Sequence, residues 1–368
     1  MIMKYFDRSK MEFYPLSSRN SKVLITESAL QPGSAPPPLE EVYQHKMDQI
    51  AREIMKARRN DRPVMLTFGA HAIKNGLSLL LAALIEENWV THLATNGAGV
   101  IHDWEFAFQG LSSEDVRVNV DKGTFGTWEE TGFTLNLALA AGAFRGWGYG
   151  ESIGAMISSG EIIIPSEEEL YSLLRGEKNS GELWQRAAAA DFLDLILAEN
   201  LKPGPLIIKH PFAEYSIQAR AFDAGVPFTS HPMFGHDIIY THRTNRGAVI
   251  GRCAERDFLC FAESVSRLEG GVYLSVGSAV MSPMIFEKSL SMARNIARRD
   301  GRVIKNCPLH VVDIQEQSWD WSRGEPPIDN PAYYHRFMKT FNRMGCPADY
   351  TCMDNRVFLH HLYKRLHK

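Results

Sequence analysis

Short apolar runs alternate with amphipathic segments along most of this chain. Short runs bounded by turn residues indicate strands, and apolar residues recurring at helical spacing indicate helices. We expect strands at 64–68, 91–95, 206–208, 226–229, 248–250, 271–276 and 309–314. We expect helices at 39–59, 76–88, 215–224, 255–268 and 285–298.

This alternation predicts an α/β fold, a parallel sheet with helices on both faces. Right-handed crossovers then place the carboxyl ends of all the strands on one edge, where ligands bind in such folds. The small-residue and helical sequence of 128–200 indicates a helical insertion within one domain that spans 41–368. Residues 1–40 end in a proline-rich stretch and should form an extended arm over the domain or a neighbouring subunit, or a partly disordered tail.

Composition narrows the possible partners and compartment. The net charge is −3, and no dense run of Lys and Arg suggests nucleic acid. The longest apolar stretch, 77–85, is too short to cross a membrane, and the N-terminus is too polar for a signal peptide. The five cysteines are odd in number and lack metal-ligand spacing, which favours a reducing, cytoplasmic location and no metal.

The loop after the first strand is built from small residues and leads into a helix. Such a loop lets a phosphate or carboxylate approach the backbone, although a plain turn where helix packs on strand would look the same. The residues concerned are Gly69, Ala70, His71 and Lys74.

Further polar and glycine-bearing loops follow the other strands. Thr95, Asn96, Gly97, Ala98 and Gly99 precede His102 and Asp103, and His236 and Asp237 follow a later strand. Gly277 and Ser278 follow 271–276, and Gln315 and Glu316 end the last predicted strand. Histidine beside carboxylate suits proton transfer near neutral pH. We therefore expect one crevice lined by these loops.

Five segments, in order, resemble deoxyhypusine synthase. They are RPVMLTFGAHAIKNGLSLLLAALIEENWVTHLATNGAGVIHDW (62–104), GVPFTSHPMFGHDIIYTH (225–242), GGVYLSVGSAVMSPMIFEKSLSMARN (270–295), VVDIQEQSWDWSRG (311–324) and TCMDNRVF (351–358). The resemblance implies a Rossmann-like sheet, a homo-oligomer (dimer or tetramer), and NAD bound near a subunit interface. It places Gln315 and Glu316 in a family motif and Asp354 on the family's aspartate. In that family NAD oxidises spermidine, and an active-site lysine carries the aminobutyl group as an imine.

The sequence departs from the family at the chemistry. The family's catalytic lysine falls at or near Arg336, whose guanidinium stays protonated and cannot form an imine. We therefore expect no deoxyhypusine synthesis, but a divergent NAD- or nucleotide-binding enzyme for an unidentified small molecule. Arg336 suits an anionic substrate, because a guanidinium binds carboxylate or phosphate in a bidentate way. The candidate catalytic residues are His102, Asp103, His236, Asp237 and Arg336. Two alternatives remain: a non-catalytic oligomeric scaffold, and aminobutyl transfer through Lys339 or Lys305.

Overall fold

The computed structural model describes residues 3–176, 182–317 and 319–367. Its centre is a six-stranded sheet in the order β10-β9-β8-β2-β3-β7, in which every neighbouring pair is parallel. The strands are β2 (Val64–Phe68), β3 (His92–Thr95), β7 (Phe228–Ser230), β8 (Val272–Val276), β9 (Leu309–Asp313) and β10 (Ala348–Cys352). The predicted α/β fold with a parallel sheet is confirmed.

The strand order reverses once. From β2 the chain adds β3 and then β7 on one side, and it returns to add β8, β9 and β10 on the other side. This order is that of the doubly wound dinucleotide-binding fold, whose ligands lie where the order reverses. Here that switch point lies between β2 and β8.

The central strands are apolar throughout because both faces of the sheet are covered. All residues of β2 and β8 are buried. Val64, Leu66 and Phe68 pack into one core, whereas Met65 and Tyr273 pack into a second core on the opposite face. Burial on both faces explains why these strands read as continuous apolar runs.

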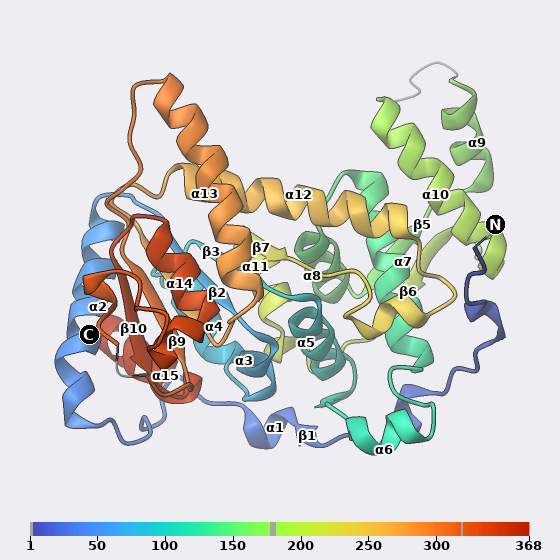
Figure 1. Ribbon diagram of the computed structural model, residues 1–368. Helices are drawn as coiled ribbons and strands as arrows, with labels where there is room; N and C mark the ends of the chain where they lie inside the picture. Colours follow the sequence, from blue (N-terminus) through green and yellow to red (C-terminus); the bar gives the residue numbers. More distant parts are fainter. Residues whose placement is uncertain (1–2, 177–181, 318, 368) are drawn as a thin grey trace.

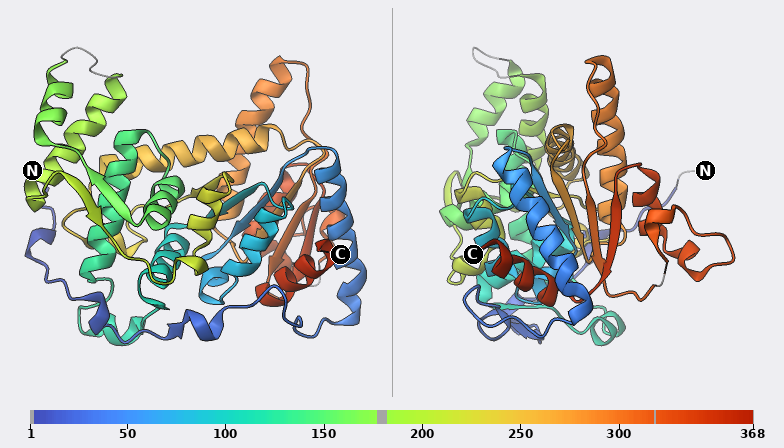
Figure 2. Two further views of the ribbon diagram at one scale, coloured as in Figure 1. Left: turned by 180° about the vertical axis from the view of Figure 1, so that it is seen from behind. Right: turned by 90° about the vertical axis from the view of Figure 1, so that its left-hand side faces the viewer.

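Helices form the two outer layers (Figures 1 and 2). One face carries α2 (Glu41–Arg59), α4 (Ser78–Glu86) and α15 (Asn355–Leu366), and the other carries α12 (Gly247–Ser266), α13 (Met281–Arg299) and α14 (Arg336–Arg343). The short α3 (Ala70–Lys74) follows β2, and α5 (Gly97–Gln109) follows β3. Two further short helices are α6 (Val116–Asp121) and α11 (Ile217–Asp223).

The predicted insertion is largely helical. It contains α7 (Glu129–Arg145), α8 (Tyr149–Ser159), α9 (Glu167–Arg175) and α10 (Leu183–Glu199), and residues 177–181 of it lie outside the described residues. It also contains β5 (Glu161–Ile164), which pairs antiparallel with β6 (Gly204–Ile207) in a separate sheet. The strand expected at 206–208 is therefore largely present, but our assignment of it to the strand–helix alternation of the parallel sheet was wrong.

Two further expectations need correction. Residues 248–250 lie inside α12, because Val249, Ile250 and Cys253 recur at helical spacing and are buried on one side of that helix. A three-residue apolar run cannot separate strand from helix by itself. We also missed β10, an edge strand with a mostly half-buried pattern and no continuous apolar run.

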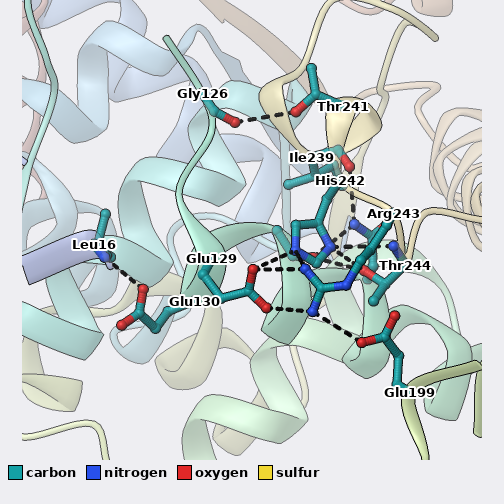
Figure 3. A network of polar contacts seen from close by, with 12 residues as sticks. Leu16, Gly126, Glu129, Glu130, Glu199, Ile239, Thr241, His242, Arg243 and Thr244 are labelled. Carbon is teal, nitrogen blue, oxygen red and sulfur yellow. Dashed lines mark hydrogen bonds and ion pairs between the residues drawn. The ribbon is translucent and has the colours of Figure 1, made fainter. Parts of the chain in front are cut away.

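The N-terminal segment runs along the outside of the domain (Figure 1). Its β1 (Val23–Leu24) pairs with β4 (Leu111–Ser112), and α1 (Ile25–Ser28) follows directly. Glu130 of α7 accepts a hydrogen bond from the Leu16 amide at 2.6 Å. Nearby, Arg243 pairs with Glu129 and with Glu199, which joins α7 and α10 to the loop before α12 (Figure 3). Within the described residues, no helix combines the length and apolarity needed to cross a bilayer.

Candidate functional site

The carboxyl ends of all six strands meet at one edge, and the loops after β2 and β8 touch there. A Cβ placed on Gly69 would lie 2.1 Å from the carbonyl oxygen of Gly277, so only glycine fits between the two backbones. The Gly69 amide also donates to the Val276 carbonyl. The two switch-point loops are therefore held together at backbone level, and cavities open on either side of them.

The first cavity, here called the aspartate pocket, lies over the ends of β8, β9 and β10. Its volume is about 330 Å³. It is lined by His71, Asn75, Gly277, Val312, Asp313, Ile314, Gln315, Met353, Asp354 and Asn355. Of the predicted cofactor residues it brings together His71, Gly277, Gln315 and Asp354.

Each aspartate of this pocket has one oxygen committed to the protein. Asp354 is the N-cap of α15, and its Oδ1 accepts the Arg356 amide at 2.8 Å. Asp313 Oδ1 accepts the Gln315 amide at 3.2 Å. The Oδ2 atom of each carboxylate has no hydrogen-bond donor among the described residues. Two carboxylate oxygens are thus available as acceptors for a ligand.

The second cavity, here called the histidine pocket, lies over the N-terminus of α5. Its volume is about 190 Å³. It is lined by Arg19, Lys74, Ala98, Ile101, His102, Glu105, Ser113, Glu114, Val116, Phe125, His236, Asp237 and Ile238. The structure therefore groups three predicted catalytic residues, His102, His236 and Asp237, with Lys74 and Ala98.

The orientation of His102 is set by a buried chain of hydrogen bonds. Ser112 Oγ donates to Glu105 Oε2 at 2.5 Å and lies 2.8 Å from His102 Nδ1. Because the hydroxyl has only one hydrogen and gives it to Glu105, it accepts a hydrogen bond from Nδ1–H. The Nε2 atom of His102 therefore carries the lone pair, and it has no hydrogen-bond partner in the described part of the chain.

The far end of this chain is a buried ion pair. Arg19 of the N-terminal segment donates to both oxygens of Glu105, at 2.6 and 2.8 Å, and both side chains are 1% exposed. Such bidentate geometry fixes the carboxylate and compensates its charge. Burial lowers the pKa of His102 to about 4, with the charge of Lys74 acting in the same direction and that of Glu105 opposing it. At neutral pH His102 is consequently an unprotonated imidazole in one tautomer.

Asp237 is the second titratable group that faces the histidine pocket. It is 8% exposed, and burial raises its pKa to about 6. Tyr240 donates to its Oδ2 at 2.9 Å. A Cβ on Gly97 would lie only 2.2 Å from the same oxygen, so Asp237 packs against the first residue of α5. The absence of a side chain at Gly97, which we predicted as a cofactor contact, makes room for this carboxylate.

The remaining charges of the histidine pocket are one lysine and one glutamate. Lys74 is half-buried and makes no hydrogen bond or ion pair with any described residue. Glu114 is 9% exposed, and its oxygens accept from Trp128 Nε1 and Asn119 Nδ2, which are both neutral donors. The pocket therefore offers an uncompensated ammonium group on one wall and carboxylates on others.

Asp103 does not line either pocket. It is 1% exposed and accepts from the Ser216 hydroxyl at 2.6 Å and the Ile217 amide at 3.0 Å. The amide and the side chain of Gln218 donate to it as well. Asp103 holds the N-terminus of α11, and these contacts support a structural role in place of the expected catalytic one.

Arg336 also lies outside both pockets. It is the first residue of α14, on the face of the sheet that α13 covers, and its side chain is exposed. Its guanidinium makes no hydrogen bond with any described residue. Lys339, on the same helix, is paired with Glu325 at 2.6 Å. The expected place of Arg336 in the crevice is therefore not found.

Other predicted cofactor residues support the backbone around the site. Thr95 Oγ1 donates to the Phe68 carbonyl, and the Asn96 side chain caps α5 by accepting the Gly99 amide. Ser278 Oγ accepts the Ser282 amide at the start of α13. Ala70 and Glu316 line neither pocket.

Sequence reasoning missed Arg19, Glu105, Ser112 and Glu114. Glu105 stands three residues after His102, a spacing that places two side chains on one face of a helix, so that signal was present. Arg19 is separated from Glu105 by 86 residues, and no local pattern relates the two.

A further cavity of about 340 Å³ lies beyond edge strand β7, between α8, α11 and α12. Its walls are mainly glycine and apolar side chains. Its buried acid, Asp257, already accepts the Ser230 and Gly150 amides at 2.6 and 3.0 Å. Among residues 3–176, 182–317 and 319–367, no three His, Cys, Asp or Glu side chains gather in a way that could hold a metal ion.

Comparison with known proteins gives a distant likeness only. No protein-family model matches the chain, and no curated protein matches it in sequence. Among solved structures, ArgZ, an arginine dihydrolase from cyanobacteria, is 14% identical with a TM-score of 0.43, and the match covers 89% of this chain and 32% of ArgZ. A complex of AgrE with L-arginine is 15% identical with a TM-score of 0.45, covering 91% and 34% of the two chains. A putative LOR/SDH protein from Methanococcus maripaludis S2 is 13% identical with a TM-score of 0.44, covering 92% and 73%. The chain thus spans about a third of ArgZ and AgrE, and likeness at this level assigns it no activity.

Proposed function

We propose that this protein binds a nicotinamide dinucleotide along the carboxyl edge of its sheet and uses the histidine pocket to oxidise or reduce a small molecule. The observation that carries the proposal is that the two pockets share the short helix α3 as part of their lining. His71 of α3 lines the aspartate pocket, and Lys74 of the same turn lines the histidine pocket. A ligand with two linked halves suits this arrangement, at the switch point of a sheet with the dinucleotide-binding strand order.

The aspartate pocket fits the adenosine half. A ribose presents two neighbouring hydroxyl groups, and a carboxylate is the usual acceptor for them in this fold. The free Oδ2 atoms of Asp313 and Asp354 supply such acceptors. Gly277 has a φ of +60°, and no atom lies within 4 Å of the place that a Cβ would take. Because glycine has no Cβ, a ligand has room to approach the backbone there. The volume of about 330 Å³ lies within the range of small-molecule sites.

The histidine pocket fits the reactive half and the substrate. A bound nicotinamide supplies a two-electron hydride acceptor or donor. His102 Nε2, unprotonated and fixed in direction, accepts the proton that a hydroxyl or amine loses on oxidation, and returns it in the reverse reaction. Lys74 attracts an anionic group of the substrate, and Asp237 accepts a hydrogen bond or balances a positive charge. We therefore assign the expected preference for an anionic substrate to Lys74 instead of Arg336.

The resemblance to deoxyhypusine synthase supports the placement of the nucleotide, because Asp354 falls on the family's aspartate. It does not extend to aminobutyl transfer. Arg336 at the lysine position is exposed, and Lys339 is paired with Glu325. The same resemblance supports a homo-oligomer, dimer or tetramer, which light scattering on the purified protein tests. The cysteine content supports a cytoplasmic location.

The test is a thermal-shift and calorimetric titration with NAD⁺. Ligand that binds only the folded state raises the melting temperature by mass action. Asp313→Asn and Asp354→Asn should each weaken NAD⁺ binding about tenfold, the loss of one good hydrogen bond to a charged acceptor. Asp329→Asn, an exposed residue outside both pockets, is the matched control and should bind as the parent does.

No shift of the melting temperature at millimolar NAD⁺ would overturn the dinucleotide assignment. Binding of NAD⁺ without turnover of any hydroxy- or amino-bearing acid would instead favour the non-catalytic binding module. If the two aspartate variants bind NAD⁺ as tightly as the parent protein does, the nucleotide does not bind in the aspartate pocket.

A further inference from the structure

A pair of buried thiols lies at the opposite end of the sheet from the candidate site. Cys307 and Cys346 immediately precede Pro308 and Pro347 at the starts of β9 and β10. Their Sγ atoms are 2.8 Å apart, and both thiols are free. The other three cysteines of the described chain make no sulfur–sulfur contact.

The strand register explains this contact. Leu309 pairs with Ala348 in the parallel ladder, so the positions two residues earlier, Cys307 and Cys346, face each other as well. The Leu309 amide donates to the Pro347 carbonyl at 2.8 Å, which holds the two strand entries together. Neighbouring strands lie about 4.8 Å apart, within the Cα separations of about 4.4–6.8 Å that disulfides span. A bond between the two sulfurs therefore requires little backbone movement.

The surroundings make one of the two thiols the nucleophile. Arg294 Nη2 lies 3.4 Å from Cys346 Sγ, and its other donors bind the Ile304 and Met344 carbonyls. The hydrogen bond from Cys307, together with the charge of Arg294, lowers the pKa of the Cys346 thiol, whereas the same contact raises that of Cys307. Thiolate beside a cation is the reactive form of cysteine.

The sulfur of Cys346 lies just beneath the surface. Its residue is 6% exposed, and its neighbours Gly345 and Pro347 are both exposed. Gly345 has a φ of +70°, a left-handed turn at the end of α14. The chain on both sides of Cys346 is therefore open to solvent.

We propose that Cys307 and Cys346 are a redox-sensitive dithiol site, which closes to a disulfide on exposure to a peroxide. The Cys346 thiolate attacks one oxygen of hydrogen peroxide, the O–O bond breaks, and a sulfenic acid and one water form after proton uptake. Cys307, losing its proton, then displaces the sulfenic oxygen as a second water and forms the S–S bond. Two thiols are oxidised and one peroxide is reduced to two waters. The proposal rests on the thiol pair alone and is independent of the nucleotide assignment.

The disulfide would bind edge strand β10 covalently to β9, the two strands whose carboxyl ends carry Asp354 and Asp313. It closes a chain segment between two cysteines that are 39 residues apart in sequence, and this segment contains α14. A loop of this length removes enough unfolded-state entropy to raise the melting temperature by roughly 5 °C in a chain of this size.

The test is a peroxide titration of the reduced, full-length protein, followed by denaturation, alkylation and intact-mass analysis. Two of the five cysteines should escape alkylation. Non-reducing peptide mapping should show Cys307 joined to Cys346, and thiol reductant should reverse both the bond and the rise in melting temperature. Cys346→Ser and Cys307→Ser should each abolish the crosslink. Cys352→Ser, a change at a half-buried cysteine of the same strand β10, should leave it intact.

Peptide mapping of the unmodified protein keeps the test decisive even where a variant fails to fold. If peroxide leaves all five thiols alkylatable, or joins a different pair, the proposed site does not exist. A sulfenic or sulfinic acid that persists on Cys346 without closing onto Cys307 also overturns the proposal.

Discussion

Gly97, the first residue of α5, lies against the carboxylate of Asp237, so that a Cβ at position 97 would fall 2.2 Å from Asp237 Oδ2. The contact joins the loop after β3 to the loop after β7, and Asp237 is one of the residues that line the histidine pocket. Gly97→Ala should therefore displace the Asp237 side chain and cost about 1–3 kcal/mol of unfolding free energy through overpacking.

Urea unfolding measures this cost. The control is Gly251→Ala in α12, where no atom lies within 4 Å of the added Cβ and the helix should gain about 0.5–1 kcal/mol. Equal effects of the two substitutions would show that Asp237 does not pack against Gly97.

The tautomer of His102 gives a second prediction, which needs no substrate. Since Ser112 donates to Glu105, His102 should carry its proton on Nδ1. Nitrogen NMR of the ring, assigned with His102→Gln, should show a protonated Nδ1 and a bare Nε2 at neutral pH. Ser112→Ala removes the acceptor and should produce a mixture of tautomers, whereas Ser158→Ala at a distant exposed site should not. A protonated Nε2 in the parent protein would contradict the assignment.

The two carboxylates of the aspartate pocket predict cofactor choice. A 2′-phosphate next to Asp313 and Asp354 would meet like charges, so NADP⁺ should bind at least about tenfold more weakly than NAD⁺. Asp354→Asn removes one negative charge and should reduce the difference in affinity between NAD⁺ and NADP⁺. Asn355→Gln, which changes no charge in the same pocket, should leave that difference as it is. Calorimetric titration with both nucleotides measures the ratio, and equal affinities for the parent protein would contradict the prediction.

Asp103 should matter for stability more than any exposed aspartate. Its carboxylate accepts from the Ser216 hydroxyl and from backbone and side-chain groups at the start of α11. Asp103→Ala leaves these buried donors without partners and should lower the unfolding free energy by about 3 kcal/mol or more. Asp329→Ala, at an exposed site, should change it by less than about 0.5 kcal/mol. If urea unfolding shows comparable small losses for both, the cap is not a major support of α11.

Acid should unfold this protein by protonating buried histidines. Burial lowers the pKa of His92 and of His231 to about 3. Between about pH 6.5 and pH 3 the unfolded chain binds protons that the native state does not, so stability falls as pH falls through this window. His92 alone should cost about 2 kcal/mol at pH 5 relative to neutral pH.

The measurement is urea unfolding from pH 7.5 to pH 4.5. His92→Gln removes one group that takes up a proton on unfolding, so the unfolding free energy should depend less steeply on pH. His45→Gln, at an exposed position of α2, should leave the pH dependence unchanged. A parent protein whose stability is constant over this range would rule out the neutral, buried state of His92.

The sequence by itself determined the class of fold and the edge at which polar loops gather. Fully buried parallel strands must be continuous apolar runs, and right-handed crossovers bring their carboxyl ends to one side, so the loops at 69–74, 95–99 and 277–278 could be placed together without coordinates. Weak local patterns gave wrong predictions. Residues 248–250, which we expected as a strand, are part of α12, and we missed the half-exposed edge strand β10 because it has no apolar run.

Only the tertiary structure decided which side chains face a pocket. His102 and Asp103 are adjacent in sequence but point in directions about 100° apart on α5, so one lines the histidine pocket and the other caps α11. Arg19, which completes the chain of hydrogen bonds behind His102, comes from the N-terminal segment, and Cys307 meets Cys346 only through the register of β9 and β10. Such contacts depend on packing between segments far apart in the chain, so local sequence patterns cannot predict them.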